Sequence, residues 1–189
     1  LVVEHLRRNR LPIRFRLSKR MTSAGGMTLS TITNGKNRPT DFEIVVSSTL
    51  LFESFRDQRP ILVTGLVCEN RLQALQRIME HEMIHLIEML IWNHSSCSAR
   101  RFRGIAQRFF GHRQSTHQLL SPADTARTRH NIVVGDWVQF DFENRQQSGF
   151  VNQITRRATV LVPTEQGRYY SDGKRYRKFY VPISRLKKV

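Results

Sequence analysis

The chain has 189 residues, of which 39% are hydrophobic and 24% are charged, a composition typical of a folded protein rather than a disordered one. Its 31 Lys and Arg outnumber its 15 Asp and Glu, and the resulting net charge of +16 favours a polyanionic partner, most commonly nucleic acid. Two cysteines are too few for a disulfide scaffold, and no apolar run approaches the roughly 20 residues that a membrane helix needs.

Short elements separated by turns are predicted for the first part of the chain. The end of a helix is expected at residues 2–8, stopped by Pro12. Alternating apolar and polar residues then predict three strands, at residues 13–17, 27–32 and 42–46. They are joined by a turn and a loop, at residues 23–26 and 34–39. Ser47 or Ser48 is expected to cap a short helix after the third strand.

The strongest helix is predicted at residues 69–92, where apolar residues recur every three or four positions. The sequence HEMIH, residues 81–85, lies in its middle. A second helix is expected at residues 99–110, with Ser98 as its N-cap and Gly111 as its end. Several arginines make this second helix basic.

In the C-terminal part of the chain, short alternating segments replace the helical spacing of apolar residues. Residues 123–131 are polar and are interpreted as a linker, which places a domain boundary after residue 129. Five short strands are predicted beyond it, at residues 137–142, 150–155, 158–162, 168–170 and 176–181. Ser171 to Gly173 form a hairpin turn signature between the last two. So many short strands in so few residues predict a small SH3-like or tudor-like barrel over residues 130–189.

The HEMIH motif has the spacing of a metal site on a helix. His81 and His85 are four residues apart and point in the same direction, so both imidazoles can bind one zinc ion. Glu82 can then reach a water molecule on that ion and accept its proton as the water attacks a peptide carbonyl. The alternative is an ordinary helix with two histidines at the edge of the core. The apolar surroundings favour the metal site, because burying polar groups without partners costs several kcal/mol.

A catalytic zinc ion usually has three protein ligands and one open position, so a third ligand must lie outside the motif. Four candidates follow the helix: His94, Cys97, His112 and His117. Cys97 has the more convenient loop length and precedes a helix N-terminus, where the dipole favours a thiolate. His94 is the second choice because it lies so close to the helix end. A small buried side chain is the alternative role for Cys97, and surface or structural roles are expected for His112 and His117.

Several stretches between residues 10 and 120 occur in a characteristic order: RFRLSKRM with the AGG turn, FEIVVSSTLL, RLQALQRIMEHEMIH, RRFRGIAQRFFGH and THQLL. In this order they resemble the SprT-like (Spartan-related) zinc metalloprotease family. The resemblance implies an α+β fold with a zincin-like metalloprotease core over residues 1–129. It also implies Zn²⁺ bound by His81 and His85, with Glu82 as the catalytic base.

One departure from the family concerns the third ligand. Members typically carry a third histidine in an HG-containing turn before the second helix, and this chain has SSCS at that place. The resemblance therefore implies Cys97 as the third zinc ligand, with His94 as the alternative. A thiolate in place of an imidazole gives more charge to zinc and makes its bound water less acidic.

Basic and aromatic residues alternate in the predicted barrel, which resembles SH3 or KOW modules. They predict phosphate contacts together with base stacking. The basic residues expected to bind nucleic acid are Arg156, Arg157, Arg168, Lys174, Arg175, Arg177 and Lys178. The alternative is that the aromatic residues fill the barrel while the charges only solvate its outside.

The leading hypothesis is a zinc-dependent endopeptidase that acts on proteins near or crosslinked to DNA, with RNA as another possible nucleic-acid partner. No membrane partner is expected, and the expected location is cytoplasmic or nucleoid-associated, or nuclear in a eukaryote. The alternative is a noncatalytic nucleic-acid-binding protein whose zinc is structural or absent. A basic surface that merely keeps the protein in solution would also account for the charge.

Overall fold

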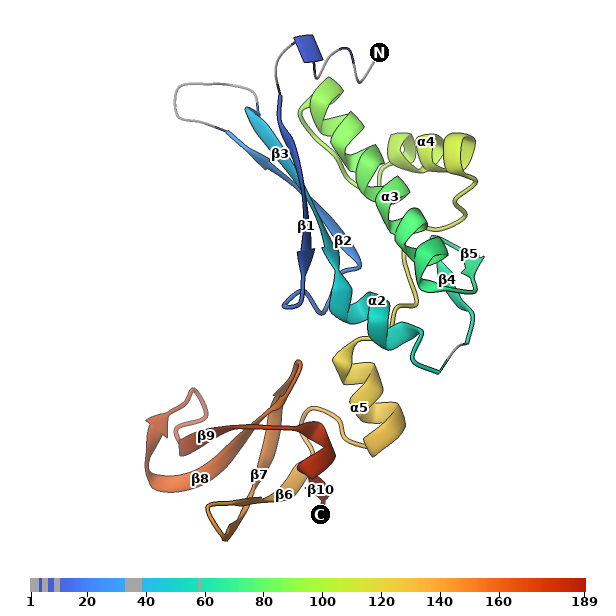
Figure 1. Ribbon diagram of the computed structural model, residues 1–189. Coiled ribbons are helices and arrows are strands. Elements are labelled where there is room, and N and C mark those ends of the chain that lie inside the picture. The colour runs from blue at the N-terminus through green and yellow to red at the C-terminus, as the bar shows by residue number, and fades with distance from the viewer. Residues whose placement is uncertain (1–3, 5–6, 9–10, 33–38, 58) are drawn as a thin grey trace. The chain divides into compact units, whose positions relative to one another are not determined.

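The computed structural model describes residues 4, 7–8, 11–32, 39–57 and 59–189 (Figure 1). The fold is mixed α+β, as expected, and the chain divides into two compact units, Leu1–Leu119 and Leu120–Val189. Each unit has its own sheet and its own hydrophobic core. None of the described helices is long and apolar enough to cross a membrane.

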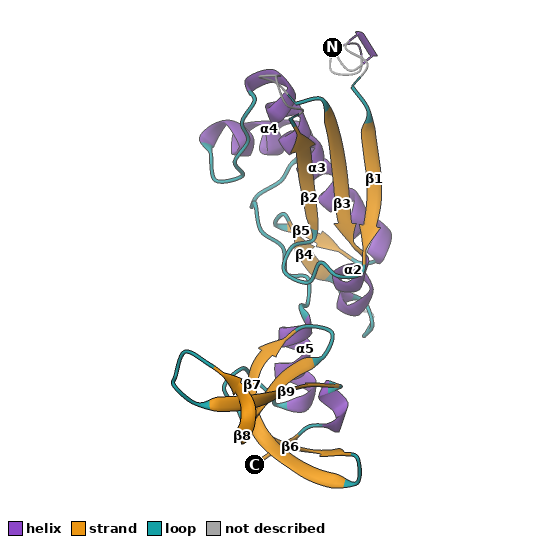
Figure 2. Cartoon of the chain, turned by 90° about the vertical axis from the view of Figure 1, so that its left-hand side faces the viewer, coloured by secondary structure: helices purple, strands orange, loops and turns teal. Residues whose placement is uncertain are grey.

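A three-stranded sheet in the order β1-β3-β2 forms the base of the N-terminal unit (Figure 2). Its strands lie where the alternating residues predicted them: β1 (Ile13–Ser18), β2 (Gly26–Thr31) and β3 (Asp41–Ser47). Strand β3 lies in the centre, parallel to β1 and antiparallel to β2. Strand β2 is therefore at an edge of this sheet. The helix end predicted at residues 2–8 and the loop at residues 34–39 fall mainly outside the described residues.

A short helix and a small hairpin follow the sheet. Helix α2 (Ser48–Ser54) is capped by Ser47, whose hydroxyl accepts a hydrogen bond from the backbone N–H of Leu50 at 3.1 Å. Strands β4 (Ile61–Val63) and β5 (Leu66–Cys68) then pair around a turn at Thr64 and Gly65, both with positive φ. The hairpin was not predicted, because three-residue strands are too short to show alternation.

The two predicted helices of this unit are present as α3 (Arg71–Trp92) and α4 (Arg100–Phe110). The Asn70 side chain caps α3 by accepting a hydrogen bond from the backbone N–H of Gln73 at 3.0 Å. Gly111 ends α4 in the left-handed conformation, as predicted. Ser98 was predicted as the N-cap of α4, but that position is Ala99, which makes no side-chain capping bond.

Helix α3 lies between the sheet and α4 (Figure 1) and is buried on two sides. Toward the sheet, Ile78 belongs to the same apolar cluster as Val46, and Leu86 joins a cluster with residues of β3. Toward α4, Ile84 packs with Phe102. Polar residues in the middle of this helix are therefore enclosed from both sides, as its apolar sequence implied.

The C-terminal unit begins with a helix where a linker was predicted. Helix α5 (Pro122–His130) starts with a capping box in which Ser121 and Asp124 bond each other's backbone N–H. The buried Ala126 anchors it, and the helix contacts β7 and the 3₁₀ turn η1 (Ile183–Arg185). The polar composition of the segment obscured these start signals. The two units divide after Leu119, whereas the sequence placed the boundary after residue 129.

An antiparallel sheet in the order β10-β6-β7-β8-β9 makes up the rest of this unit (Figure 2). Its strands are β6 (Trp137–Phe142), β7 (Arg145–Ile154), β8 (Ala158–Tyr169), β9 (Arg175–Val181) and β10 (Lys187–Lys188). The strands predicted at residues 158–162 and 168–170 are one strand, β8, with an irregularity between Pro163 and Arg168. The described strands form no closed barrel, because their pairing runs from β10 to β9 without joining these two ends.

Candidate metal centre

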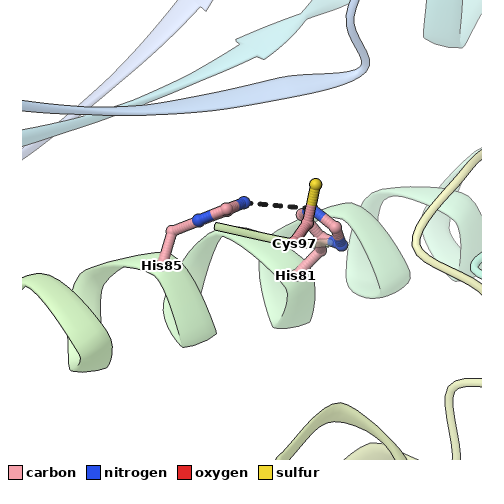
Figure 3. Close-up of side chains that lie close together, drawn as sticks. All are labelled: His81, His85 and Cys97. Atoms are coloured by element: carbon pink, nitrogen blue, oxygen red, sulfur yellow. Dashed lines mark hydrogen bonds between the residues drawn. The ribbon is translucent and has the colours of Figure 1, made fainter. Parts of the chain in front are cut away.

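His81 and His85 lie one turn apart on α3, with both rings on the same side of the helix (Figure 3). Their Nε2 atoms are 3.2 Å apart. Phe102 of α4 packs against both imidazoles, at 4.8 Å and 4.5 Å between ring centroids. The packing of α4 therefore holds the two Nε2 atoms in a convergent arrangement.

This convergence fits a shared zinc ion. Two nitrogens at the usual zinc distance in tetrahedral geometry are about 3.3 Å apart, which is close to the observed separation. Burial lowers the pKa of His81 to about 4, assisted by His85, His112 and His117, and burial also lowers the pKa of His85. Both rings are therefore neutral at neutral pH, the form that binds metal.

Cys97 joins the two histidines in a group of three possible metal ligands. One ligand atom from each of His81, His85 and Cys97 lies within 4.8 Å of the other two (Figure 3). Cys97 comes from the loop between α3 and α4 and packs against the cluster that contains Phe102. A zinc ion held by two nitrogens and one sulfur would keep a fourth tetrahedral position open, whereas closed structural zinc sites have four protein ligands.

His94, the second candidate for the third ligand, is placed differently. Its side chain is exposed, and its backbone oxygen accepts a hydrogen bond from Arg101 at 3.3 Å. Among the described residues it does not belong to the group formed by the motif histidines. The structure therefore brings Cys97, and not His94, to the predicted site.

Glu82 is a buried carboxylate on the side of α3 that faces β2, with a side chain only 5% exposed. The Thr28 hydroxyl of β2 lies 2.8 Å from its Oε2 and 3.0 Å from its backbone oxygen. Burial raises the pKa of Glu82 to about 7, although hydrogen bonds from Thr28 oppose the increase. In the described part of the chain no cation pairs with this carboxylate, and Thr28 is its hydrogen-bond partner.

The other two buried glutamates of α3 have cationic partners. Arg77 contacts Glu80 at 2.9 Å, and Arg101 contacts Glu88 at 2.7 Å. Unpaired buried charges are costly, and proteins keep them mainly where a metal or a reaction uses them. Among these three carboxylates, Glu82 is the one suited to accept a proton.

The AGG turn singled out in the sequence has a clear structural role. A Cβ atom on Gly26 would lie 2.7 Å from both Cγ and Oε1 of Glu82, and one on Gly25 would lie 2.7 Å from Leu119. Glycine at position 26 thus lets β2 approach α3, and glycine at position 25 leaves room for the Leu119 side chain. The turn lines a cleft of about 170 Å³ together with Ile78, His81, Glu82 and His117, among others.

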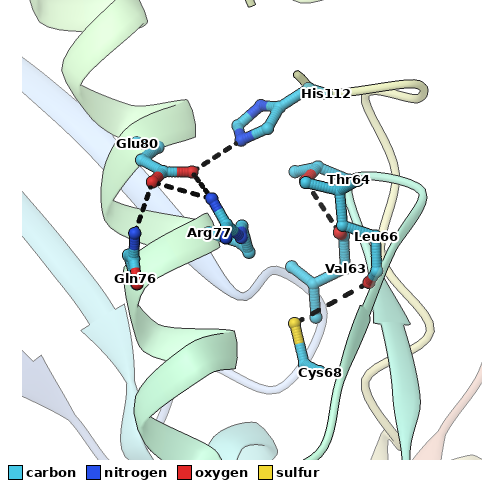
Figure 4. Close-up of polar contacts among 8 residues, drawn as sticks. All are labelled: Val63, Thr64, Leu66, Cys68, Gln76, Arg77, Glu80 and His112. Atoms are coloured by element: carbon cyan, nitrogen blue, oxygen red, sulfur yellow. Dashed lines mark hydrogen bonds and ion pairs between the residues drawn. The ribbon is translucent and has the colours of Figure 1, made fainter. Parts of the chain in front are cut away.

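His112 and His117, for which surface or structural roles were expected, each contact another segment of the N-terminal unit. The His112 ring is buried and its Nε2 lies 2.9 Å from Glu80 (Figure 4). His117 lies beside the AGG turn, where its Nε2 accepts a hydrogen bond from the backbone N–H of Gly25 at 3.0 Å. Neither ring belongs to the group of possible metal ligands.

The seven predicted nucleic-acid-binding residues are all exposed, but they do not form one group. Arg168, Arg177 and Lys178 line a hollow of about 680 Å³ between β8 and β9. Arg175 stacks on Tyr169 at 4.6 Å. Lys174 lies in the turn before β9, and Arg156 and Arg157 lie at the opposite end of β8 from this hollow.

Several residues around the candidate centre were not predicted: Thr28, Glu88, Ser95, Arg101 and Phe102. Glu88 lies on α3 itself, whereas the others come from β2, from α4 or from the loop after α3, and no sequence period predicts their contacts. Only the AGG turn signalled that β2 lies close to Glu82. No protein-family model, curated protein or solved structure matches this chain.

Proposed function

We propose that the chain is a zinc-dependent endopeptidase with a zincin-like core of the SprT-like kind. The observation that carries this proposal is the buried Glu82 carboxylate beside two converging imidazoles and a thiol. His81, His85 and Cys97 would hold the zinc ion.

The chain's own groups are arranged for hydrolysis of a peptide bond. Bound zinc would supply a water of lowered pKa and would polarise the scissile carbonyl. Glu82 accepts the proton of the attacking water at its carboxylate and passes it to the leaving amine, and its raised pKa suits both steps. Thr28 keeps one carboxylate oxygen in place through its hydroxyl.

The position of β2 at the edge of its sheet is consistent with a peptide substrate. Strand β2 carries Thr28 and borders the cleft at Gly26, and its outer edge has no paired strand among the described residues. Such an edge can add an extended peptide through main-chain hydrogen bonds. A substrate strand bound there would pass close to Glu82.

The same proposal includes the substrates of the enzyme and its location in the cell. The resemblance and the net charge of +16 point to protein substrates near or crosslinked to nucleic acid, in the cytoplasm, the nucleoid or a nucleus. The C-terminal unit, with its SH3-like or KOW-like strand content, would hold the enzyme on that nucleic acid.

The test compares zinc-loaded wild-type protein with the Glu82→Gln variant on casein and on histone, with and without DNA. We expect equal zinc content and a loss of cleavage of about 10²- to 10⁴-fold in the variant. Glu69→Gln, which changes an exposed glutamate just before α3, is the matched control and should cleave normally. Zinc-loaded protein without Glu82-dependent cleavage under any of these conditions would refute the function.

A noncatalytic nucleic-acid-binding protein is the second candidate, and the hollow between β8 and β9 favours it. Tyr169 and Tyr180 are exposed there by 68% and 63%, next to Arg168, Arg177 and Lys178. Exposed aromatic rings between cations can stack on bases while the cations neutralise phosphates. Tight nucleic-acid binding together with absent peptidase activity would favour this function over the first.

A further inference from the structure

We propose that Ser95, held by the buried Glu88, is a positioning residue that fixes the ring of His85 for metal binding and fixes the loop that carries Cys97. This inference rests on the metal site of the proposed function. It assigns a role to a serine and a carboxylate that the motif does not contain.

The hydrogen-bond directions around Ser95 define the tautomer of His85. The Ser95 hydroxyl lies 2.6 Å from Oε2 of Glu88 and 2.7 Å from Nδ1 of His85. Glu88 is a carboxylate that only accepts, so the single hydroxyl proton goes to it and the Ser95 oxygen accepts from His85. His85 therefore carries its proton on Nδ1, which leaves the lone pair of Nε2 directed at Nε2 of His81.

Glu88 is suited to hold this arrangement rigidly. Its side chain is fully buried, and its second oxygen accepts a hydrogen bond from Nε of Arg101 at 2.7 Å. Burial alone would raise the pKa of Glu88, but the hydrogen bonds from Ser95 and Arg101 lower it overall, so the group is ionised at neutral pH. The carboxylate is thus both charged and fully partnered.

The same carboxylate ties together the three segments that form the site. Glu88 belongs to α3, Ser95 to the loop that carries Cys97, and Arg101 to the first turn of α4. Arg101 also donates to the backbone oxygen of His94 in that loop and stacks over the ring of Trp92 at 4.1 Å. Through these contacts the loop is fastened at His94 and at Ser95.

Partners of this kind usually tune a metal site. A hydrogen bond to the second nitrogen of a ligating histidine orients the ring and raises its basicity, and loss of the partner typically costs 10- to 100-fold in metal affinity. Ser95 is therefore expected to act through His85 and not through contact with a substrate.

The experiment compares three variants of the full chain: Ser95→Ala, Ser95→Thr and Ser96→Ala. Ser96 is the matched control, because its hydroxyl bonds Ser98 and not a histidine. Zinc affinity is measured by competition with a chelator. The tautomer of His85 is measured in the metal-free protein from the ¹⁵N shifts of its ring.

We expect Ser95→Ala to weaken zinc binding about 10-fold or more and to reduce the Nδ1–H tautomer of His85. Ser95→Thr, which keeps the hydroxyl, and Ser96→Ala should match the wild type in both measurements. Equal affinity and equal tautomer populations in Ser95→Ala and Ser96→Ala would overturn the inference. Neither readout depends on peptide cleavage, and the tautomer does not depend on zinc, so the inference and the proposed function can fail separately.

Discussion

The backbone of Gly26 lies so close to Glu82 that a Cβ at this position would be 2.7 Å from both Cγ and Oε1 of the glutamate. Contacts this short are not tolerated between non-bonded atoms, so a side chain at position 26 must displace the carboxylate or push β2 away from α3. The glycine of the AGG turn therefore defines where the proposed catalytic base lies.

The Gly26→Ala variant should keep its zinc but lose most of its peptidase activity. The three atoms nearest to the added methyl belong to Glu82, at 2.7 Å, and to Ile78, at 2.8 Å, and not to a motif histidine. A shift of the base by about 1 Å is enough to lower cleavage by about 10²-fold. Cleavage rate and zinc content of the purified variant check this prediction.

Gly104→Ala is the matched control. Gly104 lies within α4, and a Cβ there would meet no atom within 4 Å. Replacing it should leave activity unchanged and should stabilise the helix by roughly 0.5–1 kcal/mol. Full activity in Gly26→Ala would show that the close approach to Glu82 has no functional meaning.

The Cys97→Ala variant should bind zinc far more weakly than the wild type, because it removes one of three protein ligands. His94→Ala should keep wild-type affinity, since that side chain is exposed and outside the group. Cys68→Ala provides the control for loss of a thiol: it sits in the apolar core at 0% exposure, so stability should fall while zinc affinity stays the same. A reversed order of Cys97 and His94 would identify the histidine as the ligand.

The stability of the C-terminal unit should depend on Asp136 in a pH-dependent way. Lys188 lies 2.8 Å from Asp136 and, together with the backbone N–H of Val133, holds the pKa of that carboxyl below its ordinary value. A lowered folded pKa stabilises the fold above the ordinary carboxyl pKa of about 3.9, and the stabilisation is lost as pH falls through the folded value.

Thermal unfolding of Asp136→Asn should therefore occur at a lower temperature than wild type at pH 7, and the difference should shrink on acidification below pH of about 4. Asp141→Asn, an exposed aspartate on the same sheet, should change the unfolding temperature little at either pH. A destabilisation of Asp136→Asn that is constant with pH would show that the charge of the carboxylate is not responsible.

Nucleic-acid binding should depend on the hollow between β8 and β9 more than on the opposite end of β8. Removing Arg177 or Lys178 should weaken binding and reduce the dependence of log affinity on log salt concentration by about one per lost phosphate contact. Arg156→Ala, away from the hollow, should have a smaller effect. Equal losses for Arg156 and Arg177, measured by fluorescence anisotropy over a salt series, would mean that only the overall charge matters.

Much of the N-terminal unit was predictable because its elements carry a clear period. Alternation predicted β1 to β3, and the three- and four-residue spacing of apolar residues predicted the helix that carries HEMIH. The same spacing argument placed His81 and His85 together, since it depends only on helix geometry. These features are local, and local features can be read from one sequence.

The features that were predicted wrongly, or not predicted at all, depend on contacts between distant segments. Helix α5 has a polar sequence, and burial of Ala126 against the rest of its unit, not an apolar stripe, gives it a place in the fold. The end strands β10 and β9 of the described five-stranded sheet do not pair, so the sheet stays open, which the count of strands could not reveal. The buried Glu88 of α3 pairs with the exposed Arg101 of α4, and no spacing rule predicts such a pair.

We propose that His81, His85 and Cys97 bind one zinc ion with an open fourth position. Zinc-edge X-ray absorption of the purified full chain tests it most directly. We predict one equivalent of zinc with a single sulfur at about 2.3 Å and lighter atoms at about 2.0 Å, and loss of the sulfur signal in Cys97→Ser. Absence of bound zinc after reconstitution, or a zinc signal without sulfur, would contradict the account.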